Sequence, residues 1–142
     1  MDNSLKPIAK KLLLIEDEFY IRDLYKEILE HAGFEVDLAS DGKEGLERSK
    51  LIPNLILLDI MLPKLNGLDV LKFIKGDPTT AQIPVLLITN LGQEDVIKEA
   101  FRLGAAGYLL KINLEADDLI NLVNKYLVDP TFKMDVNTLT FD

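Results

Sequence analysis

The sequence contains no cysteine and only one histidine, His31. A disulfide framework and a thiolate metal site are therefore both excluded. No run of about 18 apolar residues occurs, which is the length that a membrane-spanning helix needs. Residues 1–10 also lack the long apolar stretch and small-residue cleavage site of a secretory signal. We therefore expect a cytoplasmic protein without a membrane segment.

Positive charge is scarce in this chain. The 16 Lys and Arg residues are outnumbered by 24 Asp and Glu residues, which gives a formal net charge of −8. Because like charges repel, this balance argues against nucleic acid and anionic membranes as direct partners. It favours soluble protein partners and bound cations.

The pattern of apolar residues predicts the fold class. A chain of 142 residues with 48% hydrophobic content is one domain's worth and should bury roughly 68% of its unfolded surface. Short apolar runs alternate with helical spacings, which predicts an α/β fold with a doubly wound, five-stranded parallel sheet and five helices on its two faces. The predicted strands are 11–15, 35–39, 55–58, 85–88 and 107–110, and the predicted helices are 19–32, a short helix between Asp41 and Ile52, 68–74, 95–103 and 114–128.

Polar residues stand where four of the predicted strands end. They are Glu16 and Asp17 after the first, Asp59 after the third, Thr89 after the fourth and Lys111 after the fifth. Because ligands of open α/β sheets bind at the carboxyl ends of the strands, we expect a cleft there. Taken singly, each of these residues could also be an ordinary turn, strand end or surface charge.

The chemistry of this set predicts a metal and a phosphoryl group. Three clustered carboxylates repel one another unless a cation intervenes, and an all-oxygen set suits Mg²⁺, with Mn²⁺ as a possible substitute. Mg²⁺ typically bridges protein carboxylates and a phosphoryl group. A lysine then adds a point charge and a hydroxyl adds a hydrogen bond. Lys111 and Thr89 supply those two groups.

Four motifs in this order resemble the receiver domain of two-component response regulators. They are K-L-L-L-I-E-D-E at 11–18, L-L-D-I-M-L-P-K-L-N-G at 57–67, L-I-T-N at 87–90 and G-A-A-G-Y-L-L-K at 104–111. The similarity covers about residues 9–128. It implies a flavodoxin-like sheet with the strand order 2-1-3-4-5.

The resemblance also implies roles for the strand-end residues. Asp59 would accept a phosphoryl group from a phosphohistidine of a sensor histidine kinase or phosphotransfer protein. Mg²⁺ would be held by Asp17, Asp59 and the backbone carbonyl of Met61, and by Glu16 mainly through water. The domain would catalyse only its own phosphorylation and dephosphorylation, so it is not otherwise an enzyme.

A switch is the second implication of the resemblance. Thr89 and Lys111 would hold the phosphoryl oxygens, and Tyr108 occupies the family's aromatic switch position. Inward movement of Thr89 would let Tyr108 turn, which would reshape a protein-docking face made by helix 95–103, strand 107–110 and the last helix.

Three positions depart from the family's pattern. Glu16 stands where Asp is common, and Asn90 follows Thr89 where a small residue is usual. Ile112 replaces the usual proline after Lys111, so we expect a trans peptide there, because a cis bond before a non-proline residue costs about 3 to 4 kcal/mol.

The expected organisation is an N-terminal extension at 1–8, the receiver domain at 9–128 and a C-terminal tail at 129–142. We expect no output domain, and therefore a stand-alone, chemotaxis-type receiver that acts through a docking partner or a phosphorelay, as a monomer or weak dimer. The tail from Thr131 is expected to be disordered, because chain ends usually fray. Its alternating Phe132, Met134 and Val136 would otherwise pack as an extended segment.

Three other functions remain open from the sequence. A haloacid-dehalogenase-type phosphatase would need a second Asp where Met61 stands. A flavodoxin-like flavin carrier would need a phosphate loop where the acidic residues 16–18 would repel the phosphate. A degenerate receiver could act as a phosphorylation-independent scaffold, against which the complete acidic, Thr and Lys set weighs.

Overall fold

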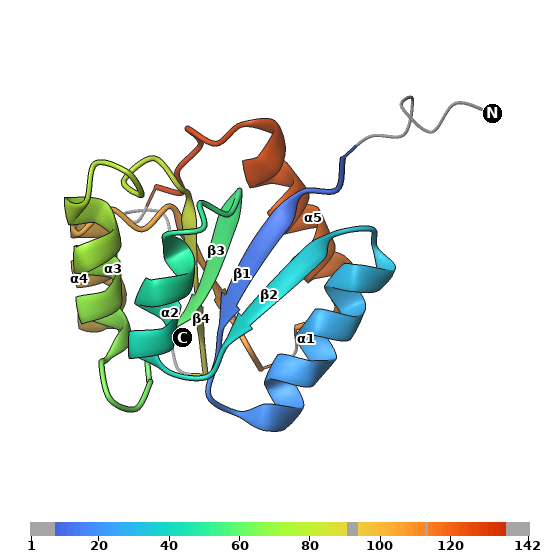
Figure 1. Cartoon of the computed structure of the whole chain (residues 1–142), viewed down its shortest axis with the longest axis horizontal. Coiled ribbons are helices and arrows are strands. Elements are labelled where there is room, and N and C mark those ends of the chain that lie inside the picture. The colour runs from blue at the N-terminus through green and yellow to red at the C-terminus, as the bar shows by residue number, and fades with distance from the viewer. Residues whose placement is uncertain (1–7, 91–93, 113, 136–142) are drawn as a thin grey trace.

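The computed structural model describes residues 8–90, 94–112 and 114–135. Five strands alternate with five helices along this part of the chain (Figure 1). The strands are β1 (Lys11–Ile15), β2 (Glu35–Ala39), β3 (Leu55–Asp59), β4 (Val85–Thr89) and β5 (Gly107–Leu110). The helices are α1 (Phe19–His31), α2 (Gly42–Ser49), α3 (Gly67–Gly76), α4 (Glu94–Arg102) and α5 (Ala116–Val128).

The five strands form one parallel sheet in the order β2-β1-β3-β4-β5, which confirms the predicted fold. Figure 1 shows α1 and α5 on one side of the sheet and α2, α3 and α4 on the other. Parallel pairing aligns the strand ends, with Ile15 opposite Leu58, Asp59 opposite Ile88, and Thr89 opposite Leu110. The residues that follow these ends are therefore brought to one edge of the sheet.

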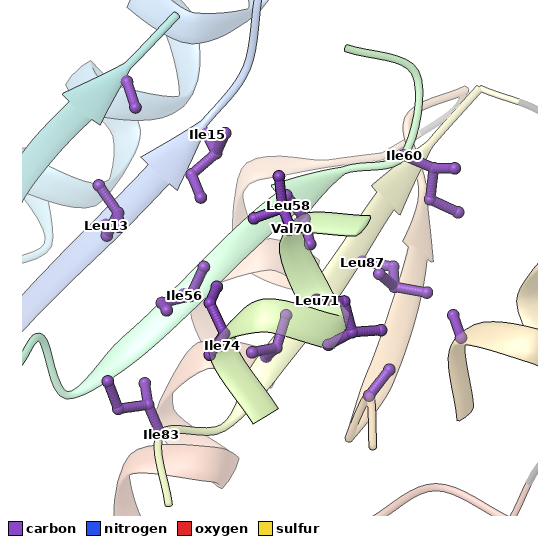
Figure 2. Close-up of a cluster of buried hydrophobic side chains, with 14 residues drawn as sticks. Leu13, Ile15, Ile56, Leu58, Ile60, Val70, Leu71, Ile74, Ile83 and Leu87 are labelled. Carbon is purple, nitrogen blue, oxygen red and sulfur yellow. The ribbon is translucent and has the colours of Figure 1, made fainter. Parts of the chain in front are cut away.

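Two hydrophobic clusters, one on each face, hold the helices to the sheet. Leu12, Leu14, Leu55 and Leu57 belong to the cluster under α1 and α5, and the alternate residues of the same strands face α3. Figure 2 shows Ile56 and Leu58 of β3 beside Val70, Leu71 and Ile74 of α3. Because β3 is buried on both faces, the backbone that carries Asp59 is held rigidly.

The loop between β3 and α3 is closed by a glycine that no larger residue could replace. A Cβ atom on Gly67 would lie 2.5 Å from the carbonyl oxygen of Asp59 and from the Cα of Ile60. The N–H of Gly67 donates to the carbonyl of Ile60 at 2.9 Å, and Asn66 caps α3 by accepting from the N–H of Asp69 at 3.0 Å. The start of α3 therefore packs directly against the backbone beside Asp59.

Helix α5 begins at Ala116 rather than at the predicted Leu114. The side chain of Glu115 accepts from the backbone of Asp118, whose own side chain accepts from the N–H of Glu115. This reciprocal capping satisfies donors of the first turn and fixes where the helix starts. Among the described residues, no helix is both long enough and apolar enough to cross a membrane.

Leu24, although apolar, lies outside the face of α1 that packs on the sheet. Leu24 is 49% exposed, whereas Tyr25 is 4% exposed. The buried stripe runs through Ile21, Tyr25 and Leu29, which are spaced by four residues and so share one face of the helix. The aromatic ring of Tyr25, rather than Leu24, therefore faces the sheet.

The described part of the C-terminal tail makes packing contacts, so the expectation of disorder was wrong for residues 131–135. The ring of Phe132 lies 5.3 Å from that of Tyr126, and the ammonium of Lys125 lies 4.0 Å above the Phe132 ring. The N–H of Met134 donates to the carbonyl of Ala106 at 2.9 Å. Val136 and the rest of the predicted tail lie outside the described residues.

Replacing Tyr126 with Phe tests how this end of the sheet is held. The fully buried Tyr126 hydroxyl donates to the carbonyl of Ala106 at 2.6 Å. Tyr126→Phe should therefore lower the free energy of unfolding at pH 7 by about 1 kcal/mol in denaturant titrations. Tyr20→Phe, which alters a ring that is 80% exposed, is the matched control.

The loss should also depend on pH. Burial raises the pKa of Tyr126 from 10.0 to about 12. The folded state therefore holds this proton more tightly, and the stabilisation is complete below pH 10 and is lost as the pH rises towards 12. The wild-type protein should lose about 1 kcal/mol relative to Tyr126→Phe between pH 9 and 11. A difference that stays constant over this range would contradict the assignment.

Candidate functional site

The predicted strand-end residues gather at the carboxyl edge of the sheet. Glu16 follows β1, Asp59 is the last residue of β3, Thr89 is the last residue of β4, and Lys111 follows β5. Glu16 is 1% exposed, and Asp59 and Thr89 are each 5% exposed. Buried polar groups require partners, and the site supplies them.

Lys111 joins the two buried carboxylates. Its ammonium donates to Oδ2 of Asp59 at 3.0 Å and forms an ion pair with Oε1 of Glu16. The side chains of all three residues are at most 6% exposed. Burial alone would lower the pKa of Lys111, but the hydrogen bonds that its ammonium donates to Glu16 and Asp59 outweigh burial and raise that pKa. The lysine therefore stays charged and links the ends of three strands.

The crowded, buried position of Glu16 changes the pKa of its carboxyl group. Burial, and after it the neighbouring Asp59, raises the pKa of Glu16 to about 7. Its Oε2 accepts from the N–H of Glu18 at 3.3 Å, so both oxygens of the carboxyl group have partners. Clustered carboxylates and burial both disfavour the charged form, and a cation would reverse that preference.

Three carboxylates are close enough to hold a metal ion. One oxygen from each of Glu16, Asp17 and Asp59 lies within 4.8 Å of the others, and Asp17 is exposed at the mouth of the cluster. These donors are all oxygen atoms and one faces solvent, which suits a hard divalent cation that keeps several water ligands. The residues therefore fit the predicted Mg²⁺.

Met61 lies beside the acidic cluster through its backbone. Its N–H donates to Oδ1 of Asp59 at 3.0 Å, while its side chain points outward in a residue that is 69% exposed. This hydrogen bond and the one from Lys111 fix both oxygens of Asp59. The role of the Met61 carbonyl as a metal ligand stays a prediction.

A cavity of about 300 Å³ opens beside Asp59. Asp59, Met61, Thr89 and Asn90 line it, together with Val96 and Ile97 of α4. A group attached to Asp59 would thus have room next to the Thr89 hydroxyl. Asn90, which departs from the family's pattern, lines this cavity at an exposed position.

Tyr108 lies on the same face of the sheet as Thr89. It pairs with Leu87, two residues before Thr89 on β4, and alternate residues of a strand share a face. Its ring is half-buried and packs with Val96 and Leu103 against the cluster under α3 and α4. The structure thus brings the two predicted switch residues to one side of the sheet.

Arg22 is a site residue that the sequence reasoning missed. Its Nη1 donates to the carbonyl oxygens of Glu16 at 3.0 Å and Asp17 at 3.2 Å. The only available signal was a basic residue five to six positions after the acidic pair, on the predicted helix.

The peptide between Lys111 and Ile112 is trans, as predicted, since the described residues include no cis bond.

Comparison with known proteins identifies the family. Residues 12–124 match the response regulator receiver domain. The chain belongs to the response regulator receiver family. It is thus a signalling domain of the phosphoacceptor type found in two-component systems, a class whose members interact with histidine kinases and downstream effectors. The two rival readings as a phosphatase or a flavin carrier are therefore set aside.

Relatives of this receiver domain occur both in longer regulators and in short chemotaxis proteins. It is 39% identical to the transcriptional regulatory protein CrdR of Helicobacter pylori over 123 residues, which are 86% of this chain and 57% of CrdR. It spans only 42% of each of two other transcriptional regulators that it matches. It is 33% identical to the chemotaxis protein CheY of Thermotoga maritima over 107 residues, which are 73% of this chain and 87% of CheY.

A solved receiver structure shares the fold and contains a metal. The receiver domain of sensor histidine kinase PA1611 from Pseudomonas aeruginosa superposes with a TM-score of 0.79 over 86% of this chain and all of that one, at 20% identity. That protein has a magnesium ion coordinated in its active-site cleft. In the present receiver domain, the spacing of the carboxylate oxygens of Glu16, Asp17 and Asp59 would by itself allow a metal to bind.

Removal of the Lys111 ammonium should destabilise the metal-free receiver domain. Lys111→Met leaves Glu16 and Asp59 buried without their common cation. Breaking a buried ion pair in this way costs about 3 kcal/mol in the free energy of unfolding. Lys64→Met, which removes an ion pair whose lysine side chain is 68% exposed, should cost less than about 1 kcal/mol. Equal losses in the two variants, measured in denaturant with chelator present, would contradict this account.

Proposed function

We propose that Asp59 is the phosphoacceptor of this receiver domain. The observation that supports this most directly is its placement at the end of a buried strand, bonded to the Lys111 ammonium and clustered with the oxygens of Glu16 and Asp17. An oxygen of Asp59 would form a bond to phosphorus as the bond between phosphorus and a donor histidine nitrogen breaks. The bonding electron pair then returns to the imidazole.

Mg²⁺ is the proposed cofactor, held by Asp17, Asp59 and the Met61 carbonyl, with Glu16 acting mainly through water. The ion supplies charge neutralisation for the phosphoryl oxygens as they approach the carboxylates. Lys111 and Thr89 then hold those oxygens, Lys111 by charge and Thr89 by a hydrogen bond from its position on the cavity wall. The same residues would also serve hydrolysis of the acyl phosphate, in which water attacks phosphorus and the Asp59 carboxylate leaves.

The proposed partners are a sensor histidine kinase or phosphotransfer protein upstream and a protein that binds the switched face downstream. We propose the cytoplasm as its location, residues 9–128 as the receiver unit, and a monomer or weak dimer as its state. The acidic charge of −8 supports a protein partner over nucleic acid. The complete set of acidic, Thr and Lys residues gives the scaffold alternative no support.

Phosphorylation of purified protein tests the acceptor. Wild-type protein with acetyl phosphate and Mg²⁺ should gain the mass of one phosphoryl group, and Asp59→Asn should not, because an amide cannot form the acyl phosphate. Asp17→Asn or chelation should suppress the gain. Asp23→Asn, which changes an exposed carboxylate on α1, should leave it intact. Persistent labelling of Asp59→Asn would assign the acceptor elsewhere.

The proposed switch couples the Asp59 cavity to the α4, β5 and α5 face. A phosphoryl group in the cavity offers acceptors to Thr89, and movement of Thr89 towards them would free space on the side of the sheet where Tyr108 packs. The phosphoryl group can shift this equilibrium only by its differential contacts with the two states. The inactive and active states should therefore differ by only a few kcal/mol.

Beryllofluoride, a mimic of the phosphoryl group, should change NMR chemical shifts at Thr89, Tyr108 and α4 of the wild-type protein. Thr89→Ala removes the hydroxyl that would donate a hydrogen bond to the bound mimic. The mimic should therefore still bind, while the chemical-shift changes at Tyr108 largely vanish. Thr79→Ala, in the turn before β4, is the matched control and should respond as wild type. Undiminished shifts at Tyr108 in Thr89→Ala would mean that the coupling takes another route.

A further inference from the structure

Arg22 connects the acidic loop after β1 to the helix that follows it. Its Nη1 donates to two consecutive carbonyls, those of Glu16 at 3.0 Å and Asp17 at 3.2 Å. Its own N–H donates to the carbonyl of Glu18 at 2.9 Å, and its guanidinium carbon lies 5.6 Å from the ring centre of Phe19. The half-buried side chain of Arg22 thus holds the backbone of the acidic loop at two successive residues, next to the first backbone bond of α1.

The geometry of the guanidinium suits this task. It is planar and rigid, and it presents donors at fixed directions, so two bonds from one nitrogen constrain how the two carbonyls lie relative to each other. Glu16 and Asp17 contribute two of the three carboxylate oxygens that lie within 4.8 Å of one another. The backbone orientation that Arg22 fixes is therefore also the one that aims both carboxylates.

We propose that Arg22 is a positioning residue for the metal-binding carboxylates of Glu16 and Asp17, an inference that rests on the proposed Mg²⁺ site. Arg22 acts through the two carbonyls and not on the metal. It arranges the acidic pair before a cation arrives, so the metal does not have to order the loop as it binds. Supporting interactions of this kind typically change metal affinity by 10- to 100-fold.

The direction in which Mg²⁺ affinity changes when Arg22 is replaced distinguishes a positioning role from simple charge repulsion. Arg22 is a cation near a cation site, so repulsion alone predicts that its removal tightens Mg²⁺ binding. Loss of positioning predicts the opposite. Arg22→Gln removes the charge and the fork, whereas Arg22→Lys keeps the charge but has a single ammonium on a shorter reach. Both variants should bind Mg²⁺ more weakly if positioning is the role.

Titration calorimetry of the full chain with MgCl2 measures this directly. Arg22→Gln should raise the Mg²⁺ dissociation constant about 10-fold, and Arg22→Lys should raise it as well. Lys26→Gln is the matched control, because it removes a positive charge from the next turn of α1, where Lys26 pairs with Glu30 at 3.2 Å. It should leave the dissociation constant unchanged. All four proteins are compared well below their unfolding temperatures.

A second measurement needs no metal. The N–H of Glu18 donates to Oε2 of Glu16, so its hydrogen exchange reports the order of the loop. In metal-free Arg22→Gln and Arg22→Lys this amide should exchange faster, while amides of the buried strand β3 should be unchanged. Faster exchange throughout the protein would instead indicate general destabilisation and would overturn the positioning role.

Phosphorylation by acetyl phosphate provides the last comparison. The rate in Arg22→Gln should fall at low Mg²⁺ and recover at saturating Mg²⁺, because only the occupancy of the site is affected. If the wild-type protein binds no Mg²⁺, the proposed cofactor and this inference are both wrong. If the wild-type protein binds Mg²⁺ and Arg22→Gln binds it equally or more tightly, only the role of Arg22 is wrong.

Discussion

The ammonium of Lys111, placed between the carboxylates of Glu16 and Asp59, is the interaction on which the site depends. It joins residues at the ends of β1, β3 and β5, although β5 pairs with neither of the other two strands. Charged groups are costly to bury unless they are paired, so neither carboxylate could occupy this edge as an anion without that cation. The rigid core beneath the site is what keeps the three groups within reach.

Much of the fold could be predicted because the sheet is buried on both faces. Such strands are continuous apolar runs, and β3 and β4 are buried throughout, as their sequences indicate. The strand order came from the family resemblance, because periodicity does not say which strands are neighbours. The buried face of α1 does not follow from spacing alone, since spacings of three and of four residues both fit a helix and only the packing shows that Tyr25 is buried and Leu24 is not.

The placement of the candidate site residues was easier to predict than their interactions. Strand-end positions follow from where apolar runs stop, so Asp59 and Lys111 could be found in the sequence. Arg22 could not, because its partners are backbone carbonyls whose positions depend on the path of the loop. The raised pKa of Glu16 likewise depends on burial that no motif records. The tail was ambiguous for a similar reason, since the contact of the Phe132 and Tyr126 rings and the bond from Met134 to Ala106 both depend on the folded structure.

The ion pair between Lys111 and Asp59 gives a physical reason why phosphorylation of Asp59 would change the position of β5. Lys111 now bonds to an oxygen of Asp59 that would carry less negative charge once the carboxylate became an acyl phosphate. The charge would then lie further out, on the phosphoryl oxygens, and the ammonium would be drawn towards them and away from Glu16. Because Lys111 follows directly on β5, and Tyr108 lies three residues before it, a shift of the ammonium would act on the strand that carries the aromatic residue. Thr89 lies opposite Leu110 on the neighbouring strand β4. The same change of charge at Asp59 would therefore act on two adjacent strands, β4 through Thr89 and β5 through Lys111.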